Sequence, residues 1–219
     1  MENIQWLGHA SFYFTDANGH KIYYVDPFSL TVLNLPKADL VFITHAHPDH
    51  FSPADLEKIV KNETVIIAPP DILAKIERDE SLKLKVEPNK SYEVQGFKFQ
   101  TIPAYNSNPA KLYFHPKANN WVGYIFELNG KKIYHAGDTD FIPEMKELKN
   151  LNLDVAMLPM DGHYTMTVEE AADAANTICA KITVPMHYQR QNPNNYQGLE
   201  EKFKKLVTNS KVEVLEELK

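Results

Sequence analysis

Short apolar runs rich in aromatic and β-branched residues, separated by polar residues, follow one another through the first part of the chain, which predicts strands. These predicted strands cover residues 4–8, 11–16, 21–27 and 40–45. The pair Asn18-Gly19 predicts a hairpin between two of them. The last of the four is a continuous apolar run, as in a strand buried on both faces. Ser52 and Pro53 then predict the N-cap and first turn of a helix.

The rest of the chain repeats this order of hairpins followed by alternating helices and strands. Predicted strands cover 64–69, 83–88, 91–95, 97–104, 121–128, 131–137, 153–159, 181–187 and 211–218, and predicted helices cover 71–79, 142–151, 168–180 and 199–207. Asn129-Gly130 predicts a second hairpin, and Thr167 with Glu170 predicts a capping box. Two such series favour an α+β fold of two mixed sheets packed face to face with helices outside.

Composition adds limits on partners and location. The 219 residues, 43% of them hydrophobic, suffice for one well-buried core, so we expect a single domain over residues 1–219. A formal net charge of −6 argues against a general nucleic-acid binder. We see no apolar run long enough for a membrane span. Cys179 is the only cysteine, so no internal disulfide can form, and we expect a cytoplasmic protein.

Candidate chemistry begins in VFITHAHPDHF, residues 41–51, where three histidines and an aspartate follow an apolar run. His45 and His47 are two positions apart, so in an extended segment their side chains leave the same side and can bind one ion. The turn at Pro48 directs Asp49 and His50 toward a neighbouring position. Imidazole and carboxylate suit Zn, Fe or Mn, and one loop can therefore serve two metals.

Two further candidate ligands follow apolar strands in the second half of the chain. They are Asp138 in YHAGDTD and His187 in VPMHYQ. An aspartate in a Gly-Asp-Thr turn is by itself ordinary turn chemistry. Together with the first group, Asp138 is better interpreted as a carboxylate that bridges two ions.

These residues resemble the metallo-β-lactamase superfamily of hydrolases, whose H-x-H-x-D-H motif is matched by His45, His47, Asp49 and His50. WLGHASFYF, YYVDP, YHAGDTD and VPMHY resemble its other motifs, so the resemblance covers nearly the whole chain. DGHYTMTVEEAADA supports a branch of metal-dependent hydrolases similar to ascorbate-6-phosphate lactonase. The resemblance implies an αββα sandwich with two divalent transition metals, zinc first and manganese or iron as alternatives.

The chain departs from the superfamily at one expected ligand. Many relatives have another histidine before the bridging aspartate, where this chain has Asn106, and an amide oxygen is a weaker ligand than imidazole. His115 lies in a loop rich in Pro and Asn that could bend back and replace it, whereas His135 points away from Asp138 in an extended strand. Water could also complete the shell.

Three other residues are candidates for substrate binding or for orienting a ligand. His9 in LGHA resembles a superfamily position near the metals, with a buried, hydrogen-bonded side chain as the alternative. Asp26 in VDPF resembles a carboxylate that orients a ligand histidine, with a strand-end turn residue as the alternative. His163 follows a strand near the expected pocket.

The ligand set implies a hydrolase in which a metal-bound hydroxide attacks an ester, lactone or phosphodiester of a small molecule. Asp49 would combine metal ligation with holding the attacking water. We find no Gly-x-Ser-x-Gly motif, and Cys179 is expected to be a small core side chain on a helix rather than a nucleophile. Segment 105–121 carries Lys111 and Lys117 and no acidic residue, which favours an anionic substrate.

Two alternative functions stay open at this point. The superfamily scaffold also carries iron-dependent redox chemistry, and Asn106 would fit a non-catalytic binding protein whose first metal site is degraded. The sequence does not define the oligomeric state.

Overall fold

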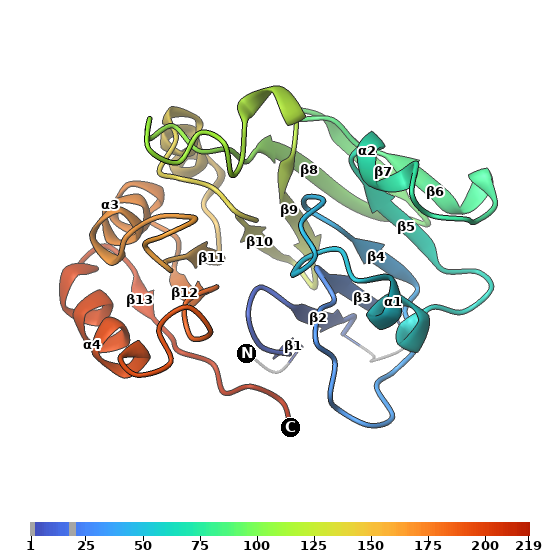
Figure 1. The fold of residues 1–219 in the computed structure, drawn as a ribbon, viewed down its shortest axis with the longest axis horizontal. Helices are drawn as coiled ribbons and strands as arrows, with labels where there is room; N and C mark the ends of the chain where they lie inside the picture. Colours follow the sequence, from blue (N-terminus) through green and yellow to red (C-terminus); the bar gives the residue numbers. More distant parts are fainter. Residues whose placement is uncertain (1–2, 18–20) are drawn as a thin grey trace. The chain divides into compact units, whose positions relative to one another are not determined.

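The computed structural model describes residues 3–17 and 21–219 (Figure 1). The chain divides into two compact units, residues 1–86 with 216–219 and residues 87–215. Each unit contains one mixed sheet. The single domain stays a prediction. The pair Asn18-Gly19 lies outside the described residues, and the strands on either side of it pair antiparallel as predicted.

The first unit has a six-stranded sheet whose strands lie in sequence order. Its strands are β1 (Ile4–Trp6), β2 (Phe12–Thr15), β3 (Ile22–Val25), β4 (Leu40–Phe42), β5 (Val65–Ala68) and β6 (Lys83–Lys85), and its helices are α1 (Pro53–Ile59), α2 (Pro70–Leu73) and the short 3-10 helix η1 (Glu80–Leu82). The first three strands pair antiparallel and the later ones parallel. In β2 Phe12 and Phe14 are buried and Tyr13 and Thr15 are half-buried, whereas β4 is buried throughout.

Local sequence signals correctly predicted the start of one helix of this unit, whereas the predicted end of the other helix is wrong. Ser52 begins α1 as predicted, because its side chain accepts a hydrogen bond from the Asp55 amide at 3.3 Å. The helix predicted over 71–79 was too long, since α2 ends at Leu73. The Arg78 guanidinium instead donates to carbonyls of residues 61, 62 and 64. These tertiary bonds replace the helical ones that the pattern predicted.

The buried carboxylate of Asp55 holds the segment after β3 to α1. It accepts hydrogen bonds from the amides of Ser29 at 2.7 Å and Leu30 at 3.0 Å, and from Lys58 Nζ at 2.8 Å. Burial by itself raises the pKa of Asp55, but the hydrogen bonds from Lys58, Ser52 and the two amides lower the pKa below its usual value.

Because the pKa of Asp55 is lower in the folded than in the unfolded chain, its stabilising effect is present above a pH of about 4 and is lost as the pH falls through the folded pKa. We expect Asp55→Asn to lower the free energy of unfolding at neutral pH by about 1.5–3 kcal/mol. Urea unfolding between pH 3 and pH 7 measures this, with the exposed Glu57→Gln on the same helix as control. Parallel pH profiles for Asp55→Asn and the wild type would contradict the assignment.

The second unit has a seven-stranded sheet in the order β13-β12-β11-β10-β9-β8-β7. Its strands are β7 (Ser91–Val94), β8 (Phe97–Pro103), β9 (Val122–Leu128), β10 (Lys131–His135), β11 (Val155–Pro159), β12 (Ile182–Met186) and β13 (Lys211–Val212). Its helices are α3 (Val168–Ile178), α4 (Tyr196–Leu206), and the 3-10 helices η2 (Lys117–Asn119) and η3 (Pro143–Leu151). β7 to β10 pair antiparallel, and β10 to β13 pair parallel.

The short-range signals of this unit are confirmed. Asn129 and Gly130 both have positive φ, 54° and 70°, and join β9 to β10. Thr167 and Glu170 form the capping box of α3. Cys179, however, is not inside the helix: it is half-buried at the C-cap with a φ of 54°, and its thiol donates to the Asn176 carbonyl.

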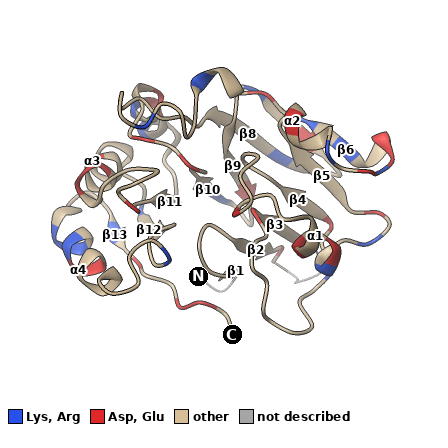
Figure 2. Cartoon of the chain, in the orientation of Figure 1, with Lys and Arg blue, Asp and Glu red and all other residues tan. Residues whose placement is uncertain are grey.

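Helix α4 shows how charge separates the inner from the outer face in this unit. It carries lysines and glutamates along its length (Figure 2), and Phe203 is its buried residue.

Among the described residues, no helix combines the length and the apolar character needed to cross a membrane.

In both sheets the loops after parallel strands carry the candidate site residues. Asp26 follows β3 and residues 44–50 follow β4, while Asp138 follows β10 and His187 follows β12. The carboxyl ends of adjacent parallel strands meet at one edge of a sheet, where ligand sites form. The fold of each unit therefore places its candidate residues together.

Candidate metal centre

The first unit gathers six predicted site residues into what we call the first cluster. Its members are His9, Asp26, His45, His47, Asp49 and His50. One carboxylate and two imidazoles of this cluster, from Asp26, His45 and His50, each offer a ligand atom within 4.8 Å of one another. His45 and His50 have ring centroids 3.9 Å apart, and His9 and His50 have ring centroids 5.5 Å apart.

Asp26 is fully buried and holds His50 in one orientation. Its Oδ1 accepts from the Thr44 amide at 2.8 Å, and its Oδ2 accepts from the Thr44 hydroxyl at 2.6 Å. The same Oδ2 lies 2.8 Å from His50 Nδ1. A carboxylate can only accept here, so His50 carries its proton on Nδ1 and keeps a lone pair on Nε2.

Thr44 fixes the tautomer of His45 by the same logic. The single hydroxyl hydrogen of Thr44 is donated to Asp26, so the Thr44 oxygen can only accept from His45 Nδ1, 2.9 Å away. His45 therefore also keeps a lone pair on Nε2. That nitrogen lies 3.1 Å from His47 Nδ1. Two histidines of the first cluster thus have a ligand nitrogen set by a partner on the opposite side of the ring.

Asp49 is the most accessible carboxylate of the first cluster. Its side chain is 35% exposed, and its Oδ2 lies 3.0 Å from Nε2 of the buried His9. His9 is held in turn by ring contacts with His50 and Phe28, and its carbonyl accepts from the Trp6 indole at 3.0 Å. Asp49 is therefore oriented by a buried histidine yet reachable by solvent.

Three candidate residues have a backbone conformation that L-residues rarely adopt. The φ angles of His9, Asp26 and His187 are 54°, 45° and 58°. Such strain costs on the order of 1–3 kcal/mol per residue and is concentrated at functional sites. The conformation of these three residues is consistent with their candidate roles.

The second unit forms what we call the second cluster, made by Asn106, His115, Asp138, Asp161 and His187. Asp138 Oδ2 lies 3.1 Å from His187 Nε2 and 3.3 Å from His115 Nε2. The side chains of all three residues are almost fully buried. Asp138 and the two histidines come from different loops. The loop that carries His115 bends back toward Asp138, as the sequence analysis suggested it could.

Asn106 orients His115. The Asn106 amide nitrogen donates to Asp140 Oδ1 at 2.9 Å and to the Tyr164 carbonyl at 3.0 Å, so the Asn106 oxygen faces His115. That oxygen lies 2.8 Å from His115 Nδ1 and can only accept. In the neutral ring, the lone pair is on the His115 nitrogen that faces Asp138.

Sequence reasoning missed Asp161. Its Oδ2 lies 3.2 Å from His187 Nδ1, and its Oδ1 accepts from the amides of His163 at 2.7 Å and Tyr164 at 2.6 Å. Burial by itself raises the pKa of Asp161, but the hydrogen bonds from His187 and Thr165 lower the pKa below its usual value. The available signal was an aspartate directly after a buried strand, the same signal that identified Asp138.

Asp140 was also missed, although it positions the loop that carries Asn106. Its Oδ1 accepts from the Asn106 amide group, and its Oδ2 accepts from the amides of Ser107 at 2.8 Å and Asn108 at 2.9 Å. In YHAGDTD, only the first aspartate after the glycine was interpreted as functional. The second carboxylate holds the loop rather than facing a ligand nitrogen.

The structure places His163 and the two loop lysines away from direct ligand positions. His163 is exposed and contacts the rings of Phe114 and Tyr164. Lys111 Nζ donates to the Thr165 carbonyl at 2.5 Å, and Lys117 Nζ lies 3.0 Å from Glu144 Oε1. Both lysines therefore have partners inside the second unit, and they lend no support to an anionic substrate.

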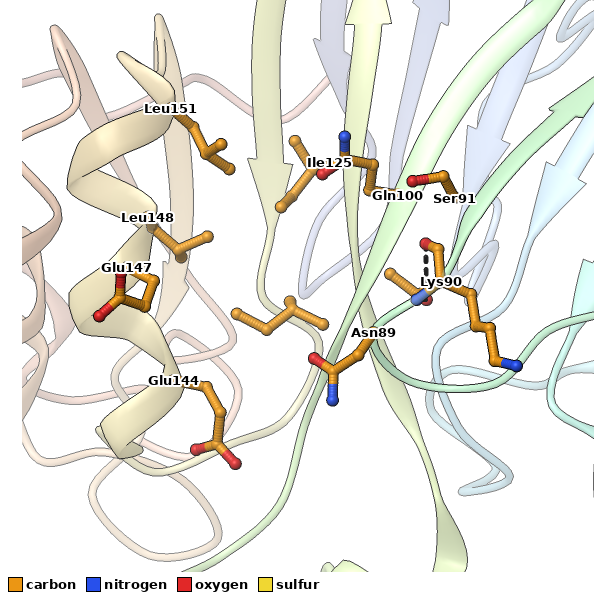
Figure 3. A pocket seen from close by; sticks show the side chains of 11 residues that line it. Asn89, Lys90, Ser91, Gln100, Ile125, Glu144, Glu147, Leu148 and Leu151 are labelled. Atoms are coloured by element: carbon orange, nitrogen blue, oxygen red, sulfur yellow. Dashed lines mark hydrogen bonds between the residues drawn. The ribbon is translucent and has the colours of Figure 1, made fainter.

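A pocket of 320 Å³ lies between η3 and the strands β7 to β9 of the second unit (Figure 3). Its walls include Ile125, Glu144 and Leu148, and none of the residues that line it is a predicted site residue. Glu144 already pairs with Lys117. This pocket therefore adds nothing to the two clusters.

Comparisons with known proteins identify relatives of the chain. The chain matches the β-lactamase superfamily domain over residues 3–187. It is 36% identical to a UPF0173 metal-dependent hydrolase of Thermococcus onnurineus, over 98% of this chain and 96% of the relative. Two solved structures are similar: a candidate metal-dependent hydrolase of Parabacteroides distasonis (TM-score 0.84, 32% identity, coverage 99% and 93%) and a metallo hydrolase of Ignicoccus hospitalis (0.76, 26%, 99% and 96%). The predicted fold class, two mixed sheets with flanking helices, is confirmed.

Proposed function

Because the chain belongs to the UPF0173 family of metal-dependent hydrolases in the metallo-β-lactamase superfamily, we propose that it hydrolyses a small ester, lactone or phosphodiester with two divalent metal ions. The proposed ligands are His45, His47, Asp49, His50, Asp138 and His187, joined by His115. Zinc is the proposed metal, with manganese or iron as alternatives.

One observation carries the proposal: Nε2 of the buried His115 and Nε2 of the buried His187 lie 3.3 Å and 3.1 Å from the same carboxylate oxygen of Asp138. Two electron-pair donors repel each other when neither carries a proton, and a cation that both can bind relieves this repulsion. The donor set supports the same conclusion, because imidazole and carboxylate without thiolate suit Zn, Mn or Fe.

Asn106 supports an intact site. Its amide group is fully used in orienting His115, which is the role that partners of ligand histidines generally have. The missing superfamily histidine is then replaced by His115 from the same loop, and Asn106 is no sign of a degraded centre.

When bound, the metals would lower the pKa of water and polarise the oxygen of the bond that is cleaved. The protein supplies the rest. Asp49, accessible and oriented by His9, would hold the attacking water and take its proton, and Asp26 and Asp161 would keep His50 and His187 in their ligand orientations. An anionic substrate is not part of the proposal, since Lys111 and Lys117 have internal partners.

A panel of chromogenic phosphodiesters, esters and lactones tests this function. We expect hydrolysis of at least one class by the wild type, its loss on removal of metal with a chelator, and its return when zinc or manganese is added. Hydrolysis that survives thorough chelation would contradict the proposal, and so would a metal-loaded protein that hydrolyses none of the three classes.

Cys179 is not expected to act as a nucleophile. Its thiol is half-buried at the C-cap of α3 and donates to the Asn176 carbonyl, so Cys179→Ala should keep at least about half of the wild-type kcat. Steady-state kinetics on the best substrate of the panel measures this. A hundredfold loss of kcat in Cys179→Ala, with unchanged metal content, would show that the thiol takes part in the reaction.

A further inference from the structure

We propose that the substrate, on the premise of the hydrolase function above, carries a planar aromatic group that stacks on an exposed aromatic platform. The aromatic platform consists of Tyr113, Phe114, His163 and Tyr164, all in the second unit. It selects the substrate by ring stacking and not by charge.

The four rings of the aromatic platform contact one another. Ring centroids are 4.0 Å apart for Tyr113 and Phe114, 4.8 Å for Phe114 and Tyr164, and 4.4 Å for His163 and Tyr164. The last two pairs are edge-to-face. In an edge-to-face pair one ring presents its edge, so its own faces are not used in that contact.

Solvent exposure of the aromatic platform is unusual for such side chains. Tyr113 is 71% exposed and Tyr164 is 37% exposed, and Leu112 beside them is 47% exposed. Three of the five exposed large hydrophobic side chains in the described part of the chain thus lie in segments 112–114 and 163–164. A concentration of exposed apolar groups marks a binding surface more often than single ones do.

The aromatic platform borders a pocket of suitable size. His163 and Tyr164 line a pocket of 540 Å³ together with Asp161, Gly162, Gln191 and Asn192. Pockets for small molecules usually measure about 300–1,000 Å³. Gln191 Oε1 is buried and has no hydrogen-bond donor among the residues that the structure describes.

Hydrogen bonds connect the aromatic platform to the proposed metal ligands. Asp161 binds the amides of His163 and Tyr164 and also faces His187, and Asn106 donates to the Tyr164 carbonyl while it orients His115. A ring held on the platform would therefore keep the bond attached to it in a fixed relation to these ligands.

The aromatic platform is also held rigid. Lys111 is buried, 9% exposed, and its ammonium group donates to the Thr165 carbonyl, which ties the loop of Tyr113 and Phe114 to the turn of His163 and Tyr164. A platform ordered before binding loses little entropy when a ligand binds. The same contact occupies the ammonium group of Lys111, which the sequence analysis had interpreted as a group that attracts an anionic substrate.

Two stable amides test the proposal without turnover: 3-phenylpropanamide and 3-cyclohexylpropanamide. They share one amide group and a similar apolar bulk, and they differ in the planarity of the ring. Ligand-observed NMR titration of the metal-loaded full-length protein should show that the phenyl compound binds about three- to tenfold more tightly.

The double variant Tyr113→Leu/Tyr164→Leu keeps apolar side chains and removes two rings. We expect it to lose the preference for the phenyl compound while metal content and melting temperature stay unchanged. Tyr196→Leu, at the start of α4, is the matched control and should keep the preference.

Equal affinities of the wild type for the two amides would overturn the proposal, as would a double variant that keeps the preference. A double variant that changes the oligomeric state without a change in ligand preference would instead identify the aromatic platform as a contact between copies of the chain. Metal loss or absent hydrolysis would count against the proposed function and leave this binding result to be judged on its own.

Discussion

Asp138→Ala is expected to abolish hydrolysis and to remove bound metal. Asp138 Oδ2 faces nitrogens of both His115 and His187, so its loss leaves two buried imidazoles without the carboxylate they share. We expect kcat/KM to fall by about a thousandfold or more, which corresponds to about 4 kcal/mol of transition-state stabilisation. Elemental analysis and steady-state kinetics measure the two effects in one preparation.

Asp154→Ala is the matched control in the same unit. Asp154 accepts from the Lys132 amide at 2.9 Å and from Lys181 Nζ at 2.7 Å, and its loss should leave metal content and kcat/KM near those of the wild type. If Asp138→Ala retained the same metal content as Asp154→Ala, Asp138 would not be a ligand.

His115→Ala is expected to lose the affinity for one of the two metals together with activity. Asn106→Ala should have a smaller effect, about 10- to 100-fold in metal affinity, because Asn106 orients the ligand and is not one itself. Titration of the metal-free protein with zinc measures both affinities. His115→Gln, which retains most of the side-chain volume, separates ligand loss from loss of packing.

A larger loss of metal affinity in Asn106→Ala than in His115→Ala would identify a different set of ligands for the first metal. If Asn106 completes the first metal site, His115→Ala should retain wild-type affinities for both ions, and Asn106→Ala should be the more damaging change. Two equally tight sites that persist in both variants would show that neither residue supports a metal.

Local signals in the sequence predicted the elements that depend on neighbouring residues. The N-cap at Ser52, the capping box of Thr167 and Glu170 and the hairpin at Asn129-Gly130 each depend on contacts within a few residues, and each is confirmed. The end of α2 was predicted incorrectly because Arg78 binds carbonyls in segment 61–64, a contact between distant parts of the sequence.

The same distinction applies to the candidate site. The residues that offer ligand atoms stood out because their types and spacing are those of metal ligands. Asp140, Asp161 and Thr44 did not, because each acts by orienting another residue, and their partners lie one to 34 positions away in the sequence. A single aspartate or threonine at a strand end is by itself a weak signal, and the partner that shows its role is identified only when the fold brings the two residues into contact.

Zinc K-edge X-ray absorption spectroscopy on the zinc-loaded protein tests the central claim, that histidines and carboxylates of this chain hold the metal. The account predicts nitrogen and oxygen scatterers at about 2.0–2.2 Å with the multiple scattering of imidazole rings. A sulfur scatterer at about 2.3 Å, or a spectrum of hydrated zinc without imidazole features, would contradict it.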